Sequence, residues 1–257
     1  MTLESAAGTG WTEDGFLGGR LSIRQPRAGY RAGVDAVMLA ASLPAKAGER
    51  VLEAGLGVGV ASLCLASRVP GLRMTGIEIQ PDLAEAARAN AARNGLSGLE
   101  VMVGDLRGPM KDWAAQGLLP GIFDHVFSNP PYFDHESHAL PPDGGKAVAH
   151  AMAAGGLEGW VRFCSVMARP GGSVTFVHRS EALPELLGEM GKLLGGIGIF
   201  PLWPREGAPA GRVLARGVRG SRAPFRLHRG LVLHGEGNSF TPAAEAVLRA
   251  GAALPFS

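Results

Sequence analysis

The residues with the clearest chemical potential form the run Ser128-Asn129-Pro130-Pro131-Tyr132. An exocyclic amine or amide nitrogen is a poor nucleophile, because its lone pair is delocalised into a π-system. The Asn129 side-chain oxygen and the Pro130 carbonyl could each accept one N–H of such a group, and Pro130 and Pro131 stiffen the loop that presents them. Tyr132 could stack on a planar acceptor, a contact worth roughly 1–3 kcal/mol. The run therefore predicts chemistry at a planar nitrogen.

This chemistry does not require a general base before the transfer step, because the nitrogen loses its proton after it has gained charge. We therefore expect His125, His135 and His138 to be loop histidines without a catalytic role. Their spacing fits no common metal-ligand pattern, so we expect no metal.

A second candidate site is the glycine-rich turn from Gly55 to Gly59, which follows a predicted strand and precedes a predicted helix. Glycines there let the backbone approach a ligand closely. A dinucleotide fingerprint requires GxGxxG, and the third glycine is missing whether the count starts at Gly55 or Gly57, which disfavours NAD and FAD. Glu53 lies two residues before the turn, where a carboxylate could meet an ammonium group but would repel a pyrophosphate.

Two further acids follow the next two predicted strands. Glu78 could accept hydrogen bonds from both hydroxyls of a ribose, and Asp105 could accept one from an adenine amine. Ligands bind beyond the carboxyl ends of the strands in open α/β sheets, so these acids and the glycine turn would share one site.

This pattern resembles the first motif of the class I S-adenosylmethionine-dependent methyltransferases, E/D-x-G-x-G-x-G. The resemblance implies S-adenosylmethionine as the cofactor and S-adenosylhomocysteine as the product. The cofactor-binding residues that it implies are Glu53, Gly55, Gly57, Gly59, Glu78, Ile79, Asp105, Leu106 and Asn129.

Strands and helices alternate through most of the chain, which predicts an α/β fold with a doubly wound, mostly parallel sheet. The family resemblance implies seven strands. Strands are expected at 50–54, 72–78, 99–103, 123–128 and 173–178, and helices at 60–68, 81–94, 157–168 and 181–194. Three further strands at 197–202, 212–218 and 230–234 have no helices between them and predict an antiparallel edge, followed by a helix that starts at Thr241.

The first part of the chain has a different pattern. Residues up to 14 are expected to form a loose tail, residues 16–30 a β-hairpin, and residues 33–43 a short helix. We expect one domain over 1–257, with a substrate-facing extension at 1–48 and a catalytic core at 49–257.

Arginines gather in two runs, although the formal net charge of +2 does not by itself indicate nucleic acid. One run is Arg20, Arg24, Arg27 and Arg31, and the other extends from Arg205 to Arg229 with Glu206 as its only acid. These runs are either solvated faces or surfaces that contact RNA. The residues proposed for RNA contact are Arg20, Arg24, Arg27, Arg31, Arg219 and Arg222.

Other bulk features point to an ordinary globular protein. Cys64 and Cys164 lie far apart in apolar contexts, which predicts buried thiols. No signal peptide and no membrane-spanning run is expected, so the default location is the cytoplasm.

The NPPY run resembles the motif of amino methyltransferases that act on adenine N6, guanine N2, cytosine N4 or glutamine amides, and it does not choose among them. The segments 15–21, 30–40, 219–224 and 231–241 resemble a bacterial family that methylates N6 of the adenine beside the anticodon of a valine tRNA. That resemblance implies tRNA as the partner. A base in an anticodon loop is also cheaper to extrude than one in a duplex. Residues 134–150, rich in Pro, Gly and His, are expected to form a mobile lid.

Several other functions compete with this one. A protein glutamine N5-methyltransferase is disfavoured, because the roughly fifty residues before the first strand do not resemble a helical bundle. A ribosomal RNA guanine N2-methyltransferase is the next candidate. A nicotinamide oxidoreductase is disfavoured by the missing glycine, and a non-catalytic RNA-binding module by the intact motifs.

Overall fold

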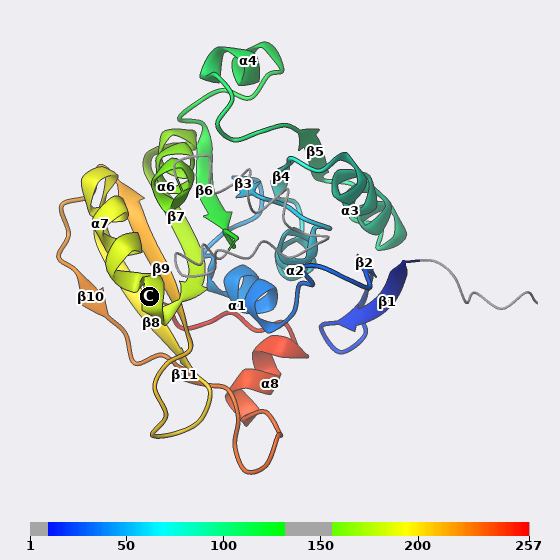
Figure 1. The fold of residues 1–257 in the computed structure, drawn as a ribbon, viewed down its shortest axis with the longest axis vertical. Coiled ribbons are helices and arrows are strands. Elements are labelled where there is room, and N and C mark those ends of the chain that lie inside the picture. Colours follow the sequence, from blue (N-terminus) through cyan, green and yellow to red (C-terminus); the bar gives the residue numbers. More distant parts are fainter. Residues whose placement is uncertain (1–9, 132–155, 257) are drawn as a thin grey trace, which may run out of the picture.

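The structure is a computed structural model that describes residues 10–131 and 156–256 (Figure 1). Within these residues, nine strands form one central sheet, and a separate hairpin packs beside it. In sheet order the strands are β10 (Arg226–Leu227), β8 (Leu194–Trp203), β9 (Arg212–Arg219), β7 (Ala168–Arg179), β6 (Phe123–Ser128), β3 (Arg50–Ala54), β4 (Arg73–Glu78) and β5 (Leu99–Val103), and β11 (Leu231–Val232) also pairs with β8.

The strand directions confirm the predicted fold class. The five strands from β7 to β5 are parallel, and β9 runs antiparallel to both β7 and β8. Seven long strands make up the expected sheet, and the two-residue strands β10 and β11 extend it. The prediction that the strand at 230–234 is antiparallel is wrong. The chain reverses its direction after β9, and the two short strands β10 and β11 then both pair with β8 in parallel.

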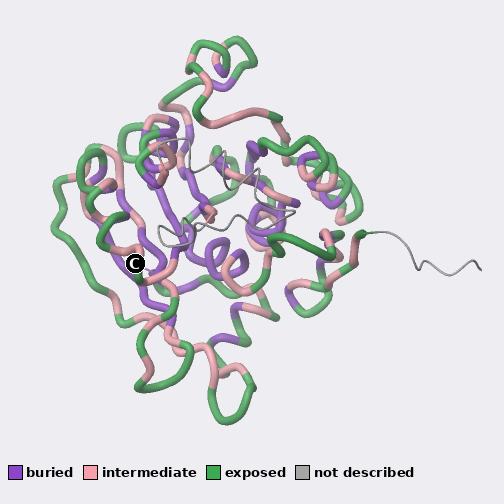
Figure 2. Tube along the Cα trace, in the orientation of Figure 1, coloured by how far each residue is buried: buried purple, intermediate pink, exposed green. Residues whose placement is uncertain are grey.

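Helices cover both faces of the sheet, so that each face has its own apolar core (Figures 1 and 2). Successive strand residues point to opposite faces, and accordingly Val51 belongs to one core and Leu52 to the other. The first core includes residues of α1 (Val34–Ser42), α2 (Val60–Arg68), α3 (Pro81–Arg93) and α8 (Pro242–Leu248). The second core includes residues of α4 (Met110–Ala115), α6 (Gly156–Met167) and α7 (Leu183–Leu193). The short helix η1 (Ser180–Ala182) directly precedes α7.

The predicted helix positions agree with the structure to within a few residues, except that α4 was not predicted. Thr241 begins α8 as expected, since its Oγ1 accepts a hydrogen bond from the Ala244 N–H at 3.2 Å. Among the described residues, no helix has both the length and the apolar character needed to cross a bilayer. Cys64 and Cys164 are buried thiols, and burial raises the pKa of Cys64 to about 12.

The hairpin consists of β1 (Trp11–Phe16) and β2 (Leu21–Pro26), which pair antiparallel. The prediction of a hairpin is confirmed, but the expected loose tail up to residue 14 is wrong from Trp11 onwards. The tail was expected because residues 11–14 are mostly polar. In the structure Trp11 pairs with Pro26 and lies under the Arg24 guanidinium, 5.1 Å from the ring centre, so cross-strand contacts hold this polar strand in place.

Asn90 of α3 and Asn94, which directly follows this helix, fasten the hairpin to the rest of the fold. The Asn90 amide accepts from the Arg24 N–H at 2.8 Å and donates to the carbonyl oxygens of Arg24 at 3.1 Å and Val58 at 3.0 Å. Asn94 makes the same pair of contacts with the backbone of Ser22, both at 2.9 Å. Asn90 is fully buried, and it therefore joins the hairpin to the loop that precedes α2.

Glu53 is an ionisable residue whose side chain lies inside the strand layer. Glu53 of β3 is 3% exposed, and its carboxyl accepts from the Ser62 N–H at 3.0 Å and the Ser62 hydroxyl at 2.5 Å. Burial is the main cause that raises the pKa of Glu53 to about 8, the Ser62 contacts lower it, and the nearby charge of Glu78 raises it further. The group therefore keeps its proton at neutral pH in the folded protein.

This burial predicts a pH-dependent effect of the substitution Glu53→Gln. Between the usual pKa of a glutamate and about 8, unfolding releases a proton that the folded protein holds, so raising the pH destabilises the wild type and not the variant. We expect the stability of Glu53→Gln relative to wild type to rise from pH 5 to pH 8, by at most about 1.4 kcal/mol per pH unit. Urea unfolding at several pH values measures it, with the exposed Glu85→Gln as the control. A constant difference would contradict a raised pKa.

Candidate active site

The carboxyl ends of β3, β4, β5 and β6 meet at one edge of the sheet (Figure 1). Ala54 at the end of β3 lies opposite Ile77 of β4 and Ser128 of β6. The Ser128 hydroxyl donates to the Ala54 carbonyl oxygen at 2.6 Å, which ties the ends of these two strands together. The glycine turn and the loops that carry Glu78, Asp105 and Asn129 therefore leave the sheet at the same edge.

Backbone geometry explains why glycines form the turn after β3. Gly55, Gly57 and Gly59 have φ angles of 75°, 56° and 88°, a region that other L-residues rarely adopt. The N–H groups of Gly55 and Leu56 both donate to the Ile77 carbonyl oxygen, at 2.9 and 2.8 Å. The turn is thus held against β4 before it enters α2.

The three glycines differ in their surroundings. A Cβ atom at Gly55 would lie 2.5 Å from the ring of Trp160 in α6, and one at Gly59 would lie 3.4 Å from Ala87. A Cβ atom at Gly57 would meet nothing within 4 Å. The backbone at Gly57 is therefore the part of the turn that a ligand can approach, and Trp160, which the sequence analysis did not identify, supports the turn from the other side.

Glu78 links this turn to the end of β4. Its two carboxylate oxygens accept from the Gly57 N–H at 2.7 Å and from the Gln80 N–H at 2.9 Å, and the residue is 5% exposed. A carboxylate has about four acceptor positions, so two remain for hydroxyl groups such as those of a ribose. The next side chain, Ile79, is an exposed apolar group at 41% and could cover a flat ring.

Asp105 follows β5 and is bound by a neighbour. The Arg107 backbone N–H donates to Asp105 at 3.0 Å and its guanidinium Nε at 2.8 Å. An adenine amine would share this carboxylate with Arg107, a residue that the sequence analysis missed. Leu106 packs against the second core and is partly buried.

These residues fit the adenosine part of S-adenosylmethionine, since acceptors and an apolar surface stand around an open backbone turn. Glu53 lies in β3 just before the glycine turn, and its carboxyl accepts hydrogen bonds from Ser62 in the first turn of α2. Its contact with the cofactor ammonium stays a prediction.

The loop that carries the predicted contacts to the methyl acceptor, which we call the acceptor loop, starts at Asn129 directly after β6. The Asn129 side-chain N–H donates to the Tyr30 hydroxyl oxygen at 2.6 Å, Pro130 is buried, and Pro131 is partly buried. Tyr132 and the segment 134–150, expected as a lid, lie outside the described residues.

The expected loop position of His125 is wrong, because this histidine lies within β6 and is 9% exposed. Its ring nitrogens lie 2.8 Å from the Ser173 hydroxyl and 3.0 Å from the Glu49 carboxylate. Burial lowers the pKa of His125, although Glu49 acts in the opposite direction. His135 and His138 lie outside the described residues.

The first arginine run is partly engaged in internal contacts. Arg31 pairs with Asp14 of β1 at 2.6 Å, an acid that is distant in sequence. Arg20 donates to the carbonyl oxygens of Leu17 and Arg249 at 3.1 and 3.2 Å. Arg24, stacked on Trp11, and Arg27 are exposed.

The second run divides into an inner and an outer part. Arg212 pairs with Asp35 at 3.0 Å, and Arg219 donates to the Val166 and Ala168 carbonyl oxygens at 3.0 and 2.5 Å, so both hold the fold together. The outer part, which we call the exposed arginine strip, consists of Arg222, Phe225, Arg226, Leu227 and Arg229.

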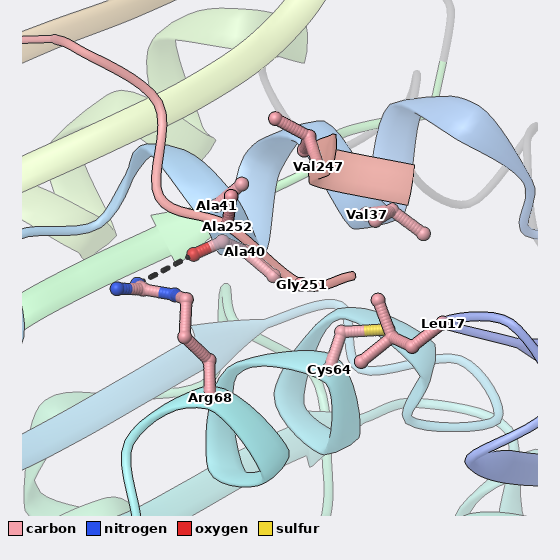
Figure 3. A pocket seen from close by; sticks show the side chains of 9 residues that line it. All are labelled: Leu17, Val37, Ala40, Ala41, Cys64, Arg68, Val247, Gly251 and Ala252. Atoms are coloured by element: carbon pink, nitrogen blue, oxygen red, sulfur yellow. Dashed lines mark hydrogen bonds between the residues drawn. The ribbon is translucent and has the colours of Figure 1, made fainter. Parts of the chain in front are cut away.

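Two hollows lie away from the strand ends. Figure 3 shows a cavity of about 10 Å³ whose walls include Leu17, Cys64 and Val247, with Arg68 directed to the Ala40 carbonyl oxygen at 2.9 Å. A cleft of about 280 Å³ lies between the hairpin turn, α1 and the end of α8. Neither hollow is lined by the acids, the glycine turn or Asn129, so neither coincides with the candidate active site at the strand ends.

The surroundings of the glycine turn predict different effects for two matched substitutions. Gly55→Ala should destabilise the protein by about 2 kcal/mol or more, because the methyl group would overlap Trp160 in addition to the backbone strain. Gly57→Ala should cost only about 1 kcal/mol of backbone strain but should weaken S-adenosylmethionine binding, because its methyl group fills the open side. Thermal unfolding and calorimetry distinguish them. Unchanged cofactor affinity in Gly57→Ala would place the ligand elsewhere.

Comparison with known proteins also indicates a methyltransferase. The family model of the methyltransferase small domain matches residues 31–154. A tRNA1(Val) (adenine(37)-N6)-methyltransferase of Porphyromonas gingivalis is 33% identical over 176 residues, 65% of this chain and 66% of the relative. A protein of the same name from Aeromonas hydrophila is 29% identical over 210 residues, 80% of this chain and 84% of the relative. The ribosomal RNA small subunit methyltransferase C of Salmonella newport is 36% identical over 101 residues, 39% of this chain and 27% of the relative.

Among solved structures, a predicted O-methyltransferase of Agrobacterium tumefaciens aligns with a TM-score of 0.70 at 28% identity, covering 86% of this chain and 98% of that one. The present chain thus spans about two thirds of the length of the Porphyromonas relative and nearly all of the aligned structure. Residues 31–154 of the chain are thus similar to the methyltransferase small-domain family, and the relatives and the aligned structure are all named as methyltransferases.

Proposed function

We propose that this protein transfers a methyl group from S-adenosylmethionine to the exocyclic N6 of an adenine in RNA, and that the RNA is a tRNA methylated in its anticodon loop. The observation that carries the proposal is the position of Asn129-Pro130-Pro131, which leave β6 beside the glycine turn. Two relatives, whose names specify adenine N6 in a tRNA, support the acceptor.

The hydrogen-bond acceptors at Asn129 and Pro130 favour a nitrogen over an oxygen as the group that receives the methyl. An exocyclic amine has two N–H groups, which match the two acceptors at the Asn129 side chain and the Pro130 carbonyl. A hydroxyl has a single proton and would leave one acceptor unpaired, which is costly in a site that excludes water. This argument separates the present chain from an O-methyltransferase, the name of the aligned structure from Agrobacterium tumefaciens.

The chain's own residues would bind and orient both reactants. The acceptors at Asn129 and Pro130 hold the two N–H groups of the amine, so that the nitrogen lone pair turns out of the ring plane. Pro130 is buried, its ring fixes its φ angle, and the following Pro131 restricts its ψ angle, so its carbonyl is held in place. Gly57, Glu78 and Ile79 would hold the cofactor. When bound, S-adenosylmethionine supplies an electrophilic methyl group.

The proposal is tested by incubating the protein with labelled S-adenosylmethionine and total bacterial tRNA, followed by mass spectrometry of the nucleosides. We expect N6-methyladenosine. In the matched variant Asn129→Ala we expect loss of transfer with cofactor affinity within about twofold of wild type, because Asn129 faces the acceptor.

The possible results discriminate between the candidate functions. Label in ribosomal RNA but not in tRNA would favour the second candidate, supported by the similarity to ribosomal RNA small subunit methyltransferase C. Label in protein would favour a glutamine acceptor. Loss of cofactor binding in Asn129→Ala would contradict the role assigned to that residue.

The exposed arginine strip is the surface that we propose for contact with the body of the RNA. Its three arginines alternate with the apolar side chains of Phe225, 55% exposed, and Leu227, 71% exposed. Cationic groups interleaved with an aromatic ring are typical of surfaces that bind single-stranded RNA. Since β10 and β11 run parallel to β8, and β8 has the same direction as β6, the strip leads toward the edge that carries Asn129.

The strip predicts a salt-dependent loss of RNA affinity. In the double variant Arg222→Ala/Arg226→Ala we expect weaker tRNA binding and a plot of log affinity against log salt that is flatter by about 0.7–0.9 per lost phosphate contact. Filter binding at several salt concentrations measures this, and Arg73→Ala, which replaces an exposed arginine at the start of β4, is the control. Equal slopes in the strip variant and wild type would remove the strip from the interface.

A further inference from the structure

Asn129 of the acceptor loop contacts the segment that follows the N-terminal hairpin. The Asn129 side-chain N–H donates to the hydroxyl oxygen of Tyr30 at 2.6 Å. Tyr30 lies in the N-terminal segment between β2 and α1, and 63% of its surface is exposed. A residue of the N-terminal segment thus contacts the side chain on which the proposed acceptor site is built.

The orientation of the Asn129 amide decides whether this site can work. A primary amide has an acceptor end and a donor end of nearly the same shape, and rotation by half a turn exchanges them. If the donor end faced the substrate amine, two N–H groups would oppose each other. A tyrosine hydroxyl can accept or donate, and in the structure that of Tyr30 accepts from the Asn129 N–H, which leaves Oδ1 for the substrate amine.

We propose that Tyr30 is a positioning residue for methyl transfer, which orients the Asn129 amide through its hydroxyl and offers its exposed ring as one wall for the planar acceptor. This inference rests on the proposed function. It assigns the N-terminal segment a direct part in the acceptor site.

The surroundings of Tyr30 make it suitable for this role, because its neighbours are fixed to the hairpin. Arg31 donates to the Thr12 hydroxyl at 2.7 Å and the Pro26 carbonyl oxygen at 2.8 Å, in addition to its ion pair with Asp14. The Ala32 N–H donates to the buried side chain of Gln25 at 2.9 Å.

The hairpin is in turn fastened to α3 and to the loop before α2 by Asn90. A chain of hydrogen bonds therefore connects the position of Tyr30 to the frame that carries the glycine turn. Preorganisation of this kind lowers the cost of orienting a polar group in a transition state.

The test compares Tyr30→Phe, which removes the hydroxyl and keeps the ring, with Tyr30→Ala, which removes both. With the tRNA that the wild type methylates, we expect Tyr30→Phe to lower kcat about tenfold, the effect of one orienting hydrogen bond, with unchanged KM for tRNA. Tyr30→Ala should show the same loss of kcat and also a several-fold higher KM, because the wall for the base is lost. Cofactor affinity and Tm should stay close to those of wild type in Tyr30→Phe.

Each other result overturns the inference. A kcat for Tyr30→Phe within about twofold of wild type would show that the hydroxyl orients nothing. A fall in Tm and in cofactor affinity together with kcat would show a structural role instead. If the wild type transfers no methyl group to RNA, the proposed function itself fails, whereas an active wild type with an unimpaired Tyr30→Phe overturns only the role of Tyr30.

Discussion

Strand β3 pairs in parallel with β4 on one side and with β6 on the other, and this pairing decides where the glycine turn, Glu78 and Asn129 lie. The register itself is fixed by the two cores, because a slip of one residue would move Val51 and Leu52 to the wrong faces. With the register fixed, the ends of the strands coincide at Ala54, Ile77 and Ser128. The hydrogen bond from Ser128 to Ala54 and those from the glycine turn to Ile77 then tie the ligand-facing loops to one rigid edge.

The same edge contains two nearly buried carboxyl groups, and the structure stabilises them in different ways. Glu78 is held by two backbone N–H groups, at Gly57 and Gln80. Glu53 lies deeper, and burial raises its pKa to about 8, so that it stays protonated at neutral pH. A cation bound near Glu53 would favour its charged form. This environment suits a positively charged cofactor better than a pyrophosphate, in agreement with the missing third glycine.

Sequence reasoning succeeded where a pattern is local and failed where the structure depends on distant contacts. The strands 50–54 and 99–103 and the turn between Gly55 and Gly59 follow from apolar runs and glycine spacing, and they were predicted at their observed positions. Strand β1 has no such pattern, since residues 11–14 are mostly polar and their strand state comes from pairing with β2. Likewise, Arg31 and Arg219 read as parts of basic runs, yet Asp14 and the carbonyls of Val166 and Ala168 engage them only after folding.

The N-terminal hairpin could help to form the proposed site for the methyl acceptor, although it is small. A two-stranded hairpin alone is marginally stable, so it can position a reactive group only if it is anchored elsewhere. Asn90 supplies this anchor, because one buried amide bonds to Arg24 of the hairpin and to Val58 beside the glycine turn. The segment that follows the hairpin carries Tyr30 to the Asn129 side chain. Through Asn90 and Tyr30, the extension is tied to both halves of the candidate site, the cofactor turn and the acceptor loop. A base delivered to this site would therefore meet a surface whose geometry is already set by the sheet.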